Sequence, residues 1–346
     1  MFSKFRFGIS KDLAIDLGTA NTLIFEKDKG VVINQPSMVA VIREKGYEIP
    51  YLFGDGAKQM AGKTPLHMSV YRPLQDGVIA DFRVAEEMIR HFVNAALGKR
   101  IGVRATIIVC VPFEATDVEK RAIQTAVEKC SVKEVFLIEE PMAAAIGAGL
   151  PVNDPFGSMI VDIGGGTSEI AIISLGGVVH GRSVKIGGDA MDRTIIQYVR
   201  QKYNLLIGSS TAEKIKKEIG VAILNKNQEP KKTNIRGRDL LSGTPREIII
   251  SETDMGSALA EPVSQIVEAV RIALEAVPPE LASDIVDRGI VLTGGGAMLK
   301  NMDLAISRAT NLPVFIAPFP LYCVAIGAGK VLSNKEKHMN ILFKQG

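Results

Sequence analysis

Strand-like and helix-like hydrophobic patterns alternate along most of this 346-residue chain. Residues 13–17 and 23–26 are short apolar runs, which predict two strands joined by a turn of small residues. The continuous, β-branched run at 105–111 is typical of a strand buried on both faces, and further strands are predicted at 135–138 and 289–292. Such alternation predicts an α/β fold, with parallel strands and flanking helices.

Two helices are predicted from apolar residues that recur three and four positions apart. The apolar face of the first consists of Val84, Met88, Ile89, Phe92, Val93 and Ala96. That of the second consists of Val118, Ala122, Ile123, Ala126 and Val127. Pro141 lies near the first turn of a third predicted helix, where proline is tolerated.

A weak internal repeat suggests two related halves. Residues 13–19 (LAIDLGT) resemble residues 160–167 (IVDIGGGT), each with an apolar strand, an Asp, a Gly and small polar residues. The match is short, so chance similarity remains an alternative. Residues 36–71 and 183–256 look like insertions, and the second contains a polar basic stretch, 225–238, that we expect to be a solvated loop.

Composition agrees with a soluble protein of about two domains, since 47% of the residues are apolar and 23% are charged. A net charge of +3 is too small to indicate a nucleic-acid partner. The three cysteines form no C-x-x-C pair and the four histidines show no metal-ligand spacing, so we expect buried thiols and no zinc or iron. No apolar run reaches the roughly 18 residues of a membrane span, and the expected location is cytoplasmic.

The first candidate site is the turn after the strand 13–17. Its Gly and small residues let backbone N–H groups approach an anion, and Thr19 and Asn21 add side-chain donors. Asp16 is unsuited to touching phosphate but suited to holding a hydrated Mg²⁺. A plain glycine turn between two strands explains this motif equally well.

The second turn carries a stronger signal, because three consecutive glycines, Gly164 to Gly166, weaken a strand and favour contact between ligand and backbone. Asp162 repeats the metal-side role, and Thr167 is placed to orient a water or contact the terminal phosphate. A third glycine cluster, 293–297, follows a predicted strand and opens into a helix, a common nucleotide contact.

Two further groups are ambiguous by spacing alone. Glu213 lies three and four residues before Lys216 and Lys217 on a predicted helix, which indicates an intrahelical ion pair or a polar clamp on ribose and base. Glu139 and Glu140 end a strand, where α/β proteins place ligands, so one of them is a candidate to polarise a water. Negative charge at a helix N-terminus is the alternative.

These motifs resemble those of the actin, Hsp70 and sugar-kinase superfamily: residues 16–21, 162–167 and 293–297 resemble its two phosphate motifs and its adenosine motif, and 139–145 its first connecting helix. Gly187, Gly188 and Asp192 resemble a turn of its Hsp70-like members. Residues 14–23, 76–82, 140–150 and 278–285 most resemble the MreB family of bacterial actin homologues, over about residues 10–335.

The resemblance implies an actin-like ATPase fold with two related halves, each carrying a small inserted subdomain. Residues 1–35, 72–146 and 320–346 would form subdomain IA, and 36–71 subdomain IB. Residues 147–182 and 257–319 would form subdomain IIA, and 183–256 subdomain IIB.

It also implies ATP and Mg²⁺ as cofactors, with assigned residues. Asp16 and Asp162 would face the metal through water, while Glu140 orients the hydrolytic water with help from Thr167. The implied nucleotide contacts are Thr19, Ala20, Asn21, Gly164, Gly165, Gly166, Thr167, Glu213, Lys214, Ile215, Lys216, Lys217, Gly294, Gly295, Gly296, Ala297 and Met298.

The implied role is a filament that maintains rod cell shape by organising wall elongation, with a slow ATPase coupled to polymerisation. A metabolite kinase is disfavoured because no substrate cluster is found, and an Hsp70-type chaperone because no peptide-binding domain is expected. A non-polymerising nucleotide switch remains an alternative.

An N-terminal membrane contact is expected as well. As a helix, residues 1–11 would place Phe2, Phe5 and Ile9 on one face, although Phe7 falls off it, and a disordered tail is the alternative. Ile101 and Val103 form a second apolar spot. The resemblance implies the inner face of the cell membrane as location, with RodZ and MreC as partners.

Overall fold

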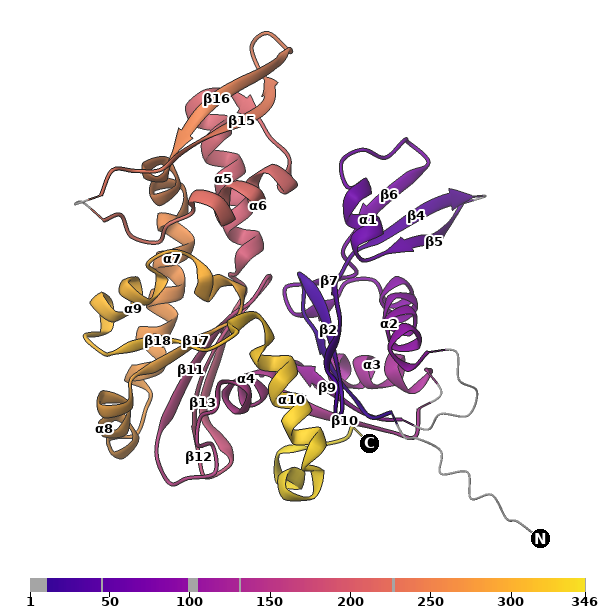
Figure 1. Ribbon diagram of the computed structural model, residues 1–346, viewed down its shortest axis with the longest axis vertical. Coiled ribbons are helices and arrows are strands. Elements are labelled where there is room, and N and C mark those ends of the chain that lie inside the picture. The colour runs from indigo at the N-terminus through magenta and orange to yellow at the C-terminus, as the bar shows by residue number, and fades with distance from the viewer. Residues whose placement is uncertain (1–10, 45, 99–104, 131, 226–227, 346) are drawn as a thin grey trace. The chain divides into compact units, whose positions relative to one another are not determined.

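The computed structural model describes residues 11–44, 46–98, 105–130, 132–225 and 228–345. The chain forms two compact units, each with its own apolar core. The first unit comprises Met1–Met60, Thr64–Gly147 and Val324–Gly346, and the second Ala61–Lys63 and Ala148–Cys323. In Figure 1 the indigo and purple elements and the yellow helix α10 belong to the first unit.

The main sheet of the first unit has five strands in the order β10-β9-β1-β2-β3. The strands β1, β9 and β10 run parallel, whereas β1, β2 and β3 form an antiparallel meander. Every residue of β9 is buried, as its continuous apolar sequence predicted. The bounds are β1 Leu13–Leu17, β2 Asn21–Glu26, β3 Gly30–Pro36, β9 Thr106–Val111 and β10 Glu134–Glu139.

The helices of this unit follow the predicted periodicity with one correction. All six apolar residues predicted for α2 are buried, and Asp81 caps its N-terminus. In α3, Val118 is 76% exposed, so its predicted place in the apolar stripe was wrong, and Gln124 is buried instead. The helices are α2 Phe82–Leu97, α3 Asp117–Glu128, α4 Glu140–Ala148 and α10 Cys323–Ser333, followed by the 3-10 helix η3 Lys335–Ile341.

The insertion at 36–71 is more regular than its turn-rich sequence indicated. It forms a three-stranded sheet, β5-β4-β6, packed against a short helix. Its elements, with a small hairpin that follows them, are β4 Val39–Glu44, β5 Tyr47–Phe53, α1 Asp55–Met60, β6 Met68–Tyr71, β7 Leu74–Gln75 and β8 Val78–Ile79.

The main sheet of the second unit repeats the first in topology. Its order is β13-β12-β11-β17-β18, with an antiparallel meander followed by two parallel strands. The two sheets therefore share one plan, and the α/β fold with two related halves is confirmed. The bounds are β11 Ser158–Ile163, β12 Ser168–Ser174, β13 Gly177–Val184, β17 Ile290–Thr293 and β18 Val314–Ile316.

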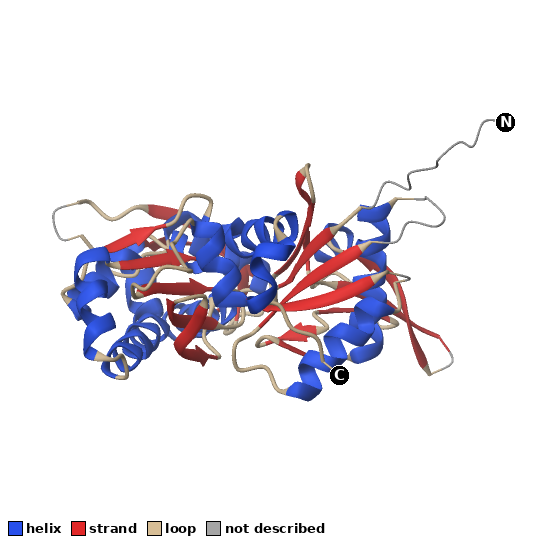
Figure 2. Cartoon of the chain, turned by 90° about the horizontal axis from the view of Figure 1, so that it is seen from below, coloured by secondary structure: helices blue, strands red, loops and turns tan. Residues whose placement is uncertain are grey.

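Helices pack on this sheet: α7 contacts β12 and β13, and α8 contacts β11. Figure 2 distinguishes the helices of the chain (blue) from its strands (red). The bounds are α5 Gly188–Tyr203, α6 Ser209–Ile219, α7 Glu252–Glu275, α8 Pro279–Arg288, α9 Met302–Thr310, and the 3-10 helices η1 Gly295–Met298 and η2 Pro320–Tyr322.

The second insertion contains the three-stranded sheet β14-β15-β16. The basic stretch predicted as a loop at 225–238 is partly strand, because β15 alternates buried and exposed residues. The bounds are β14 Leu205–Leu206, β15 Lys232–Asp239 and β16 Pro245–Ser251.

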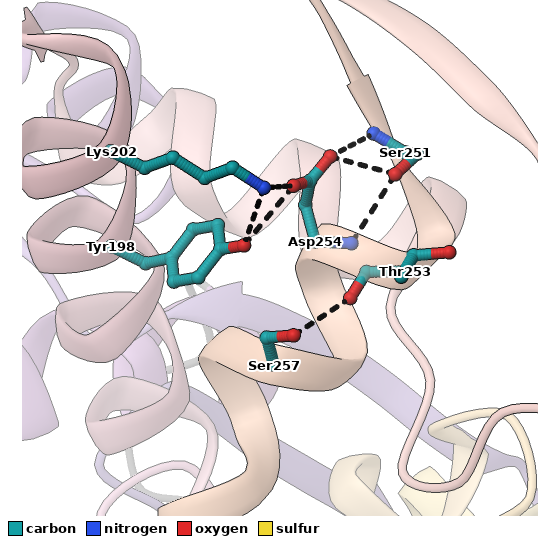
Figure 3. A network of polar contacts seen from close by, with 6 residues as sticks. All are labelled: Tyr198, Lys202, Ser251, Thr253, Asp254 and Ser257. Atoms are coloured by element: carbon teal, nitrogen blue, oxygen red, sulfur yellow. Dashed lines mark hydrogen bonds and ion pairs between the residues drawn. The ribbon is translucent and has the colours of Figure 1, made fainter.

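A polar network fixes the start of α7 (Figure 3). Ser251 and Asp254 form a reciprocal capping box. Asp254 also accepts from Tyr198 (3.1 Å) and pairs with Lys202, so α5 is fastened to α7. Burial alone would raise the pKa of Asp254, but the hydrogen bonds from Lys202 and Ser251 outweigh it and hold the pKa far below its usual value.

The C-terminal tail lies along β10. Leu137 and Phe343 exchange two backbone hydrogen bonds of 2.8 and 3.1 Å. Gln124 and Gln345 pair reciprocally, the Gln124 side chain with the Gln345 backbone (3.2 and 2.9 Å). These contacts attach the tail to the edge of the first sheet.

The three cysteines, Cys110, Cys130 and Cys323, are free and buried, as predicted. Among the helices within the described ranges, none is both long and apolar enough to cross a membrane.

Candidate functional site

The first hairpin turn is held by a hydroxyl that the sequence did not point to. The Ser37 side chain donates to the Gly18 carbonyl (2.6 Å), and the Ser37 N–H donates to the Ala20 carbonyl (3.0 Å). A Cβ on Gly18 would lie 2.7 Å from the Asn21 carbonyl oxygen, so this tight turn requires glycine. Ser37 therefore holds the turn at Gly18 to Ala20 in place through two hydrogen bonds.

The predicted phosphate donors of this turn differ in exposure. Asn21 is exposed and donates from its amide to Asn34 (2.7 Å). Thr19 is buried, and its hydroxyl accepts from the Gly77 N–H (3.2 Å). The hydroxyl of Thr19 thus already links the hairpin to the segment before α2.

Parallel register brings the acidic candidates of the first unit to one end of its sheet. Asp16 and Ile138 are both register partners of Cys110, and Glu139 and Glu140 follow directly. Burial raises the pKa of Glu139, and Lys120 offsets part of the rise. Asp16, Glu139 and Glu140 are each half-buried at the carboxyl ends of parallel strands, where α/β folds bind ligands.

The second hairpin starts from a buried carboxylate. Asp162 lies in β11 beside Thr293 of β17, and only 8% of it is exposed. Burial raises its pKa to about 6, and the neighbouring Thr293 hydroxyl opposes the rise. Within the described part of the chain, Asp162 Oδ1 has no hydrogen-bond partner of ordinary geometry. Such an atom is costly unless a ligand or cation satisfies it.

The glycine loop after Asp162 is backed by α5. The Gly164 N–H donates to the Thr167 carbonyl (2.8 Å) and closes the turn. From the first turn of α5, the N–H groups of Gly188 and Asp189 donate to the carbonyls of Gly164 (3.0 Å) and Gly165 (2.8 Å). The loop carbonyls thus accept hydrogen bonds from N–H groups in the first turn of α5, which have no partner within their own helix.

The third glycine cluster packs directly on the second hairpin. Gly294 has φ of +79°, and a Cβ there would lie 2.3 Å from Asp162 Oδ1. A Cβ on Gly296 would lie 2.1 Å from the Ile163 side chain. Ala297 is buried, whereas Met298 is 59% exposed. The structure therefore places the 294–296 loop directly against Asp162 and Ile163.

Of the predicted α6 residues, the structure separates the roles. Ile215 is buried in the core and Lys214 is exposed. Lys217 pairs with Glu213 (2.6 Å), the i,i+4 alternative expected from spacing. Lys216 instead reaches α5, where it pairs with Asp192 (2.9 Å) and donates to the Gly188 carbonyl (2.6 Å). The sequence had already placed Asp192 in an Hsp70-like turn, but only the fold shows that it pairs with Lys216.

The donor set fits a Mg²⁺ held mainly by phosphates and water. No cluster of three or more His, Cys, Asp or Glu residues suited to a metal exists among the residues that the structure describes. Mg²⁺ commonly uses one or two carboxylates together with nucleotide phosphates and waters. The unpartnered Oδ1 of Asp162 suits that mode. The predicted membrane residues Phe2, Phe5, Ile9, Ile101 and Val103 lie outside the described residues.

Comparison with solved structures identifies the fold. MreB5 of Spiroplasma citri bound to ADP superposes with a TM-score of 0.89 at 36% identity, covering 96% of this chain and 99% of that one. The same protein bound to AMPPNP gives the same score and identity. The MamK double helical filament gives 0.77 at 21% identity over 92% of this chain and 98% of that one, a likeness of fold alone. With two sheets of one topology and glycine turns after Asp16 and Asp162, the chain is an actin-like protein.

Relatives in sequence show to which family of actin-like proteins the chain belongs. The profile described as MreB/Mbl protein matches residues 10–340. Cell shape-determining protein MreB of Escherichia coli (strain K12) is 50% identical over 348 residues, covering 100% of both chains. Cell shape-determining protein Mbl of Bacillus subtilis (strain 168) is 45% identical, covering 95% of this chain and 97% of that one. The chain belongs to the MreB/Mbl family.

Proposed function

We propose that this protein is an ATP-binding, membrane-associated actin-like protein that polymerises into filaments and maintains rod cell shape by organising wall elongation. The observation that carries the nucleotide part is the buried carboxylate of Asp162, which starts the glycine hairpin and packs against Gly294. Among the residues that the structure describes, none gives its Oδ1 a hydrogen bond of ordinary geometry. The ADP and AMPPNP complexes of MreB5, which shares 36% identity, support the same ligand class.

The proposed phosphate contacts are the turns Thr19 to Asn21 and Gly164 to Thr167. Their backbone N–H groups and hydroxyls suit an anion. The 294–298 loop and the exposed face of α6 are proposed to hold the adenosine. Bound Mg²⁺ would neutralise phosphate charge, and Asp16 and Asp162 are the residues proposed to hold it through water.

Hydrolysis is proposed to be slow. Glu140, half-buried at the start of α4, would orient the attacking water with help from Thr167. Neither residue is a strong base, and phosphoryl transfer that relies on water orientation without an arginine finger is weakly catalysed. We therefore propose an ATPase whose output is a change in assembly rather than product.

Self-assembly is the proposed readout of the nucleotide. Head-to-tail contacts between identical subunits do not close on themselves and so generate filaments. The MamK filament has the same fold, which makes such assembly compatible with this architecture. We also propose that the chain has four subdomains, with residues 36–71 forming subdomain IB and residues 183–256 forming subdomain IIB.

The membrane and partner parts rest on sequence alone. Phe2, Phe5 and Ile9, with Ile101 and Val103, are proposed to contact the inner face of the cell membrane. One short amphipathic segment binds weakly, but a filament that carries many copies binds through avidity. RodZ and MreC are proposed as membrane partners.

A sedimentation experiment tests the proposal. Purified protein is centrifuged with Mg²⁺·ATP, with and without anionic liposomes, next to Asp162→Ala and Phe2→Glu/Phe5→Glu variants. We expect ATP-dependent pelleting of the wild type, none for Asp162→Ala, and loss of liposome binding alone for the double variant. A wild type that binds ATP but stays monomeric in every condition would instead establish a non-polymerising switch.

A further inference from the structure

The Lys216 side chain points to the first turns of α5, the helix that packs behind the Gly164–Gly166 loop, and not into solvent. We propose that Lys216, paired with Asp192, positions the Gly164–Gly166 loop through the first turn of α5, so that its effect on nucleotide binding is exerted on the phosphates and not on the base. This inference rests on the proposed ATP site and assigns a route of action within it.

The first turn of α5 has almost no freedom against the loop. A Cβ on Gly187 would lie 2.6 Å from the Gly164 oxygen and 2.7 Å from the Gly165 oxygen. Two backbone hydrogen bonds, from Gly188 and Asp189, span the same gap. Any displacement of this turn therefore moves the loop with it.

Lys216 holds that turn from the other side. Its ammonium donates to the Gly188 carbonyl (2.6 Å), which shares a peptide group with the Asp189 N–H that donates to Gly165. The same ammonium pairs with Asp192, one turn further along α5 (2.9 Å). Only 14% of the Lys216 side chain and 12% of the Asp192 side chain are exposed. A cation near a helix N-terminus is unfavourable by itself, so Asp192 is needed to keep it there.

The neighbouring lysine offers a contrast within one helix. Lys217 has 68% of its side chain exposed and is paired with Glu213, so its ammonium is largely in solvent. Lys216 is the inward member of the two and is linked to the loop. On the far side of α6, Thr233 of β15 donates to Glu218 (2.8 Å). Lys216 thus connects the phosphate loop to a helix that is itself fastened to the inserted sheet.

Affinities for ATP, ADP and adenosine separate positioning from base contact. They are measured by competition against a fluorescent ATP analogue for the wild type, Lys216→Met, Lys216→Arg and Asp192→Asn. We expect Lys216→Met and Asp192→Asn to weaken ATP and ADP about tenfold or more, the effect of losing a charged hydrogen bond, with adenosine changed less than about twofold. Lys216→Arg, which keeps charge and donors, should restore most of the loss.

Lys202→Met is the matched control, because it breaks an ion pair at the other end of α5 (Figure 3). It should lower thermal stability and leave all three affinities unchanged. Equal losses for ATP, ADP and adenosine in Lys216→Met would overturn the inference in favour of a base or ribose contact. Unchanged ATP affinity in folded Lys216→Met and Asp192→Asn would also overturn it. A wild type that binds none of the ligands would refute the proposed function itself.

Discussion

Gly187→Ala provides a sharp test of how tightly α5 is packed on the glycine loop. Gly187 and Gly208 are both N-cap residues, of α5 and α6, in extended conformations, and neither makes a side-chain cap. They differ in surroundings, since a Cβ on Gly187 meets two carbonyl oxygens within 2.7 Å, whereas one on Gly208 meets nothing within 4 Å. The pair isolates crowding from every other effect of the substitution.

The magnitude follows from the contacts. Overpacking costs about 1–3 kcal/mol, and the two backbone hydrogen bonds to Gly164 and Gly165 contribute about 0.5–1.5 kcal/mol each if they are lost. We expect Gly187→Ala to destabilise the second unit by about 2–6 kcal/mol. For Gly208→Ala, the poorer cap and the lower entropy of the unfolded chain nearly cancel, leaving a change within about 0.5 kcal/mol.

Thermal unfolding monitored by circular dichroism measures both variants. The cost for Gly187→Ala corresponds to a Tm lower by about 5–20 °C for a unit of this size, against about 2 °C or less for Gly208→Ala. Repeating the melt with Mg²⁺·ATP should show less protection by nucleotide in Gly187→Ala, because the substitution displaces the Gly164–Gly166 loop that is proposed to contact phosphate. Two variants that melt together would refute the close-packing argument.

Three further changes have defined outcomes. Asp162→Asn removes a carboxyl whose pKa is raised by burial to about 6. Urea titrations should therefore show the wild type, but not the variant, losing about 3 kcal/mol of unfolding free energy as the pH rises from about 4 to about 6. Parallel pH curves for the two proteins would contradict this expectation. Deleting residues 342–346 removes the Phe343 bridge to β10, so the Tm should fall by a few degrees and light scattering should rise; an unaltered melt without scattering would argue against this role of the tail. Gly327→Ala places a Cβ 1.8 Å from the Ala143 carbonyl oxygen, so α10 must separate from α4 and the Tm should drop by more than about 5 °C; a wild-type melt would show that the crossing adapts.

Local signals predicted much of the architecture. The apolar strands around Asp16 and Asp162 and the glycines after them appear in the structure as matching hairpins in two sheets of the same order. Such features depend on residues close in sequence, where strand alternation and glycine conformation act directly. The same is true of α2, whose complete apolar stripe is buried.

Long-range contacts account for what the sequence pattern missed. Val118 fits the stripe of α3 by periodicity but lies in the first turn with 76% exposed, while Gln124 is buried because it pairs with Gln345, 221 residues later. Spacing on α6 allowed Glu213 to pair with either lysine, and only the fold shows that Lys216 turns to Asp192. Ser37 had no motif at all, since its role comes from the turn it supports.

The tail contact at β10 has a consequence for assembly. A chain proposed to join copies of itself end to end must not also join them strand to strand, because an open sheet edge recruits any passing strand without stopping. The backbone groups of Leu137 that would recruit one are already occupied by Phe343 of the same chain. In the proposed filament, the contact between Phe343 and Leu137 would thereby keep this edge of the first sheet from pairing with a strand of another copy.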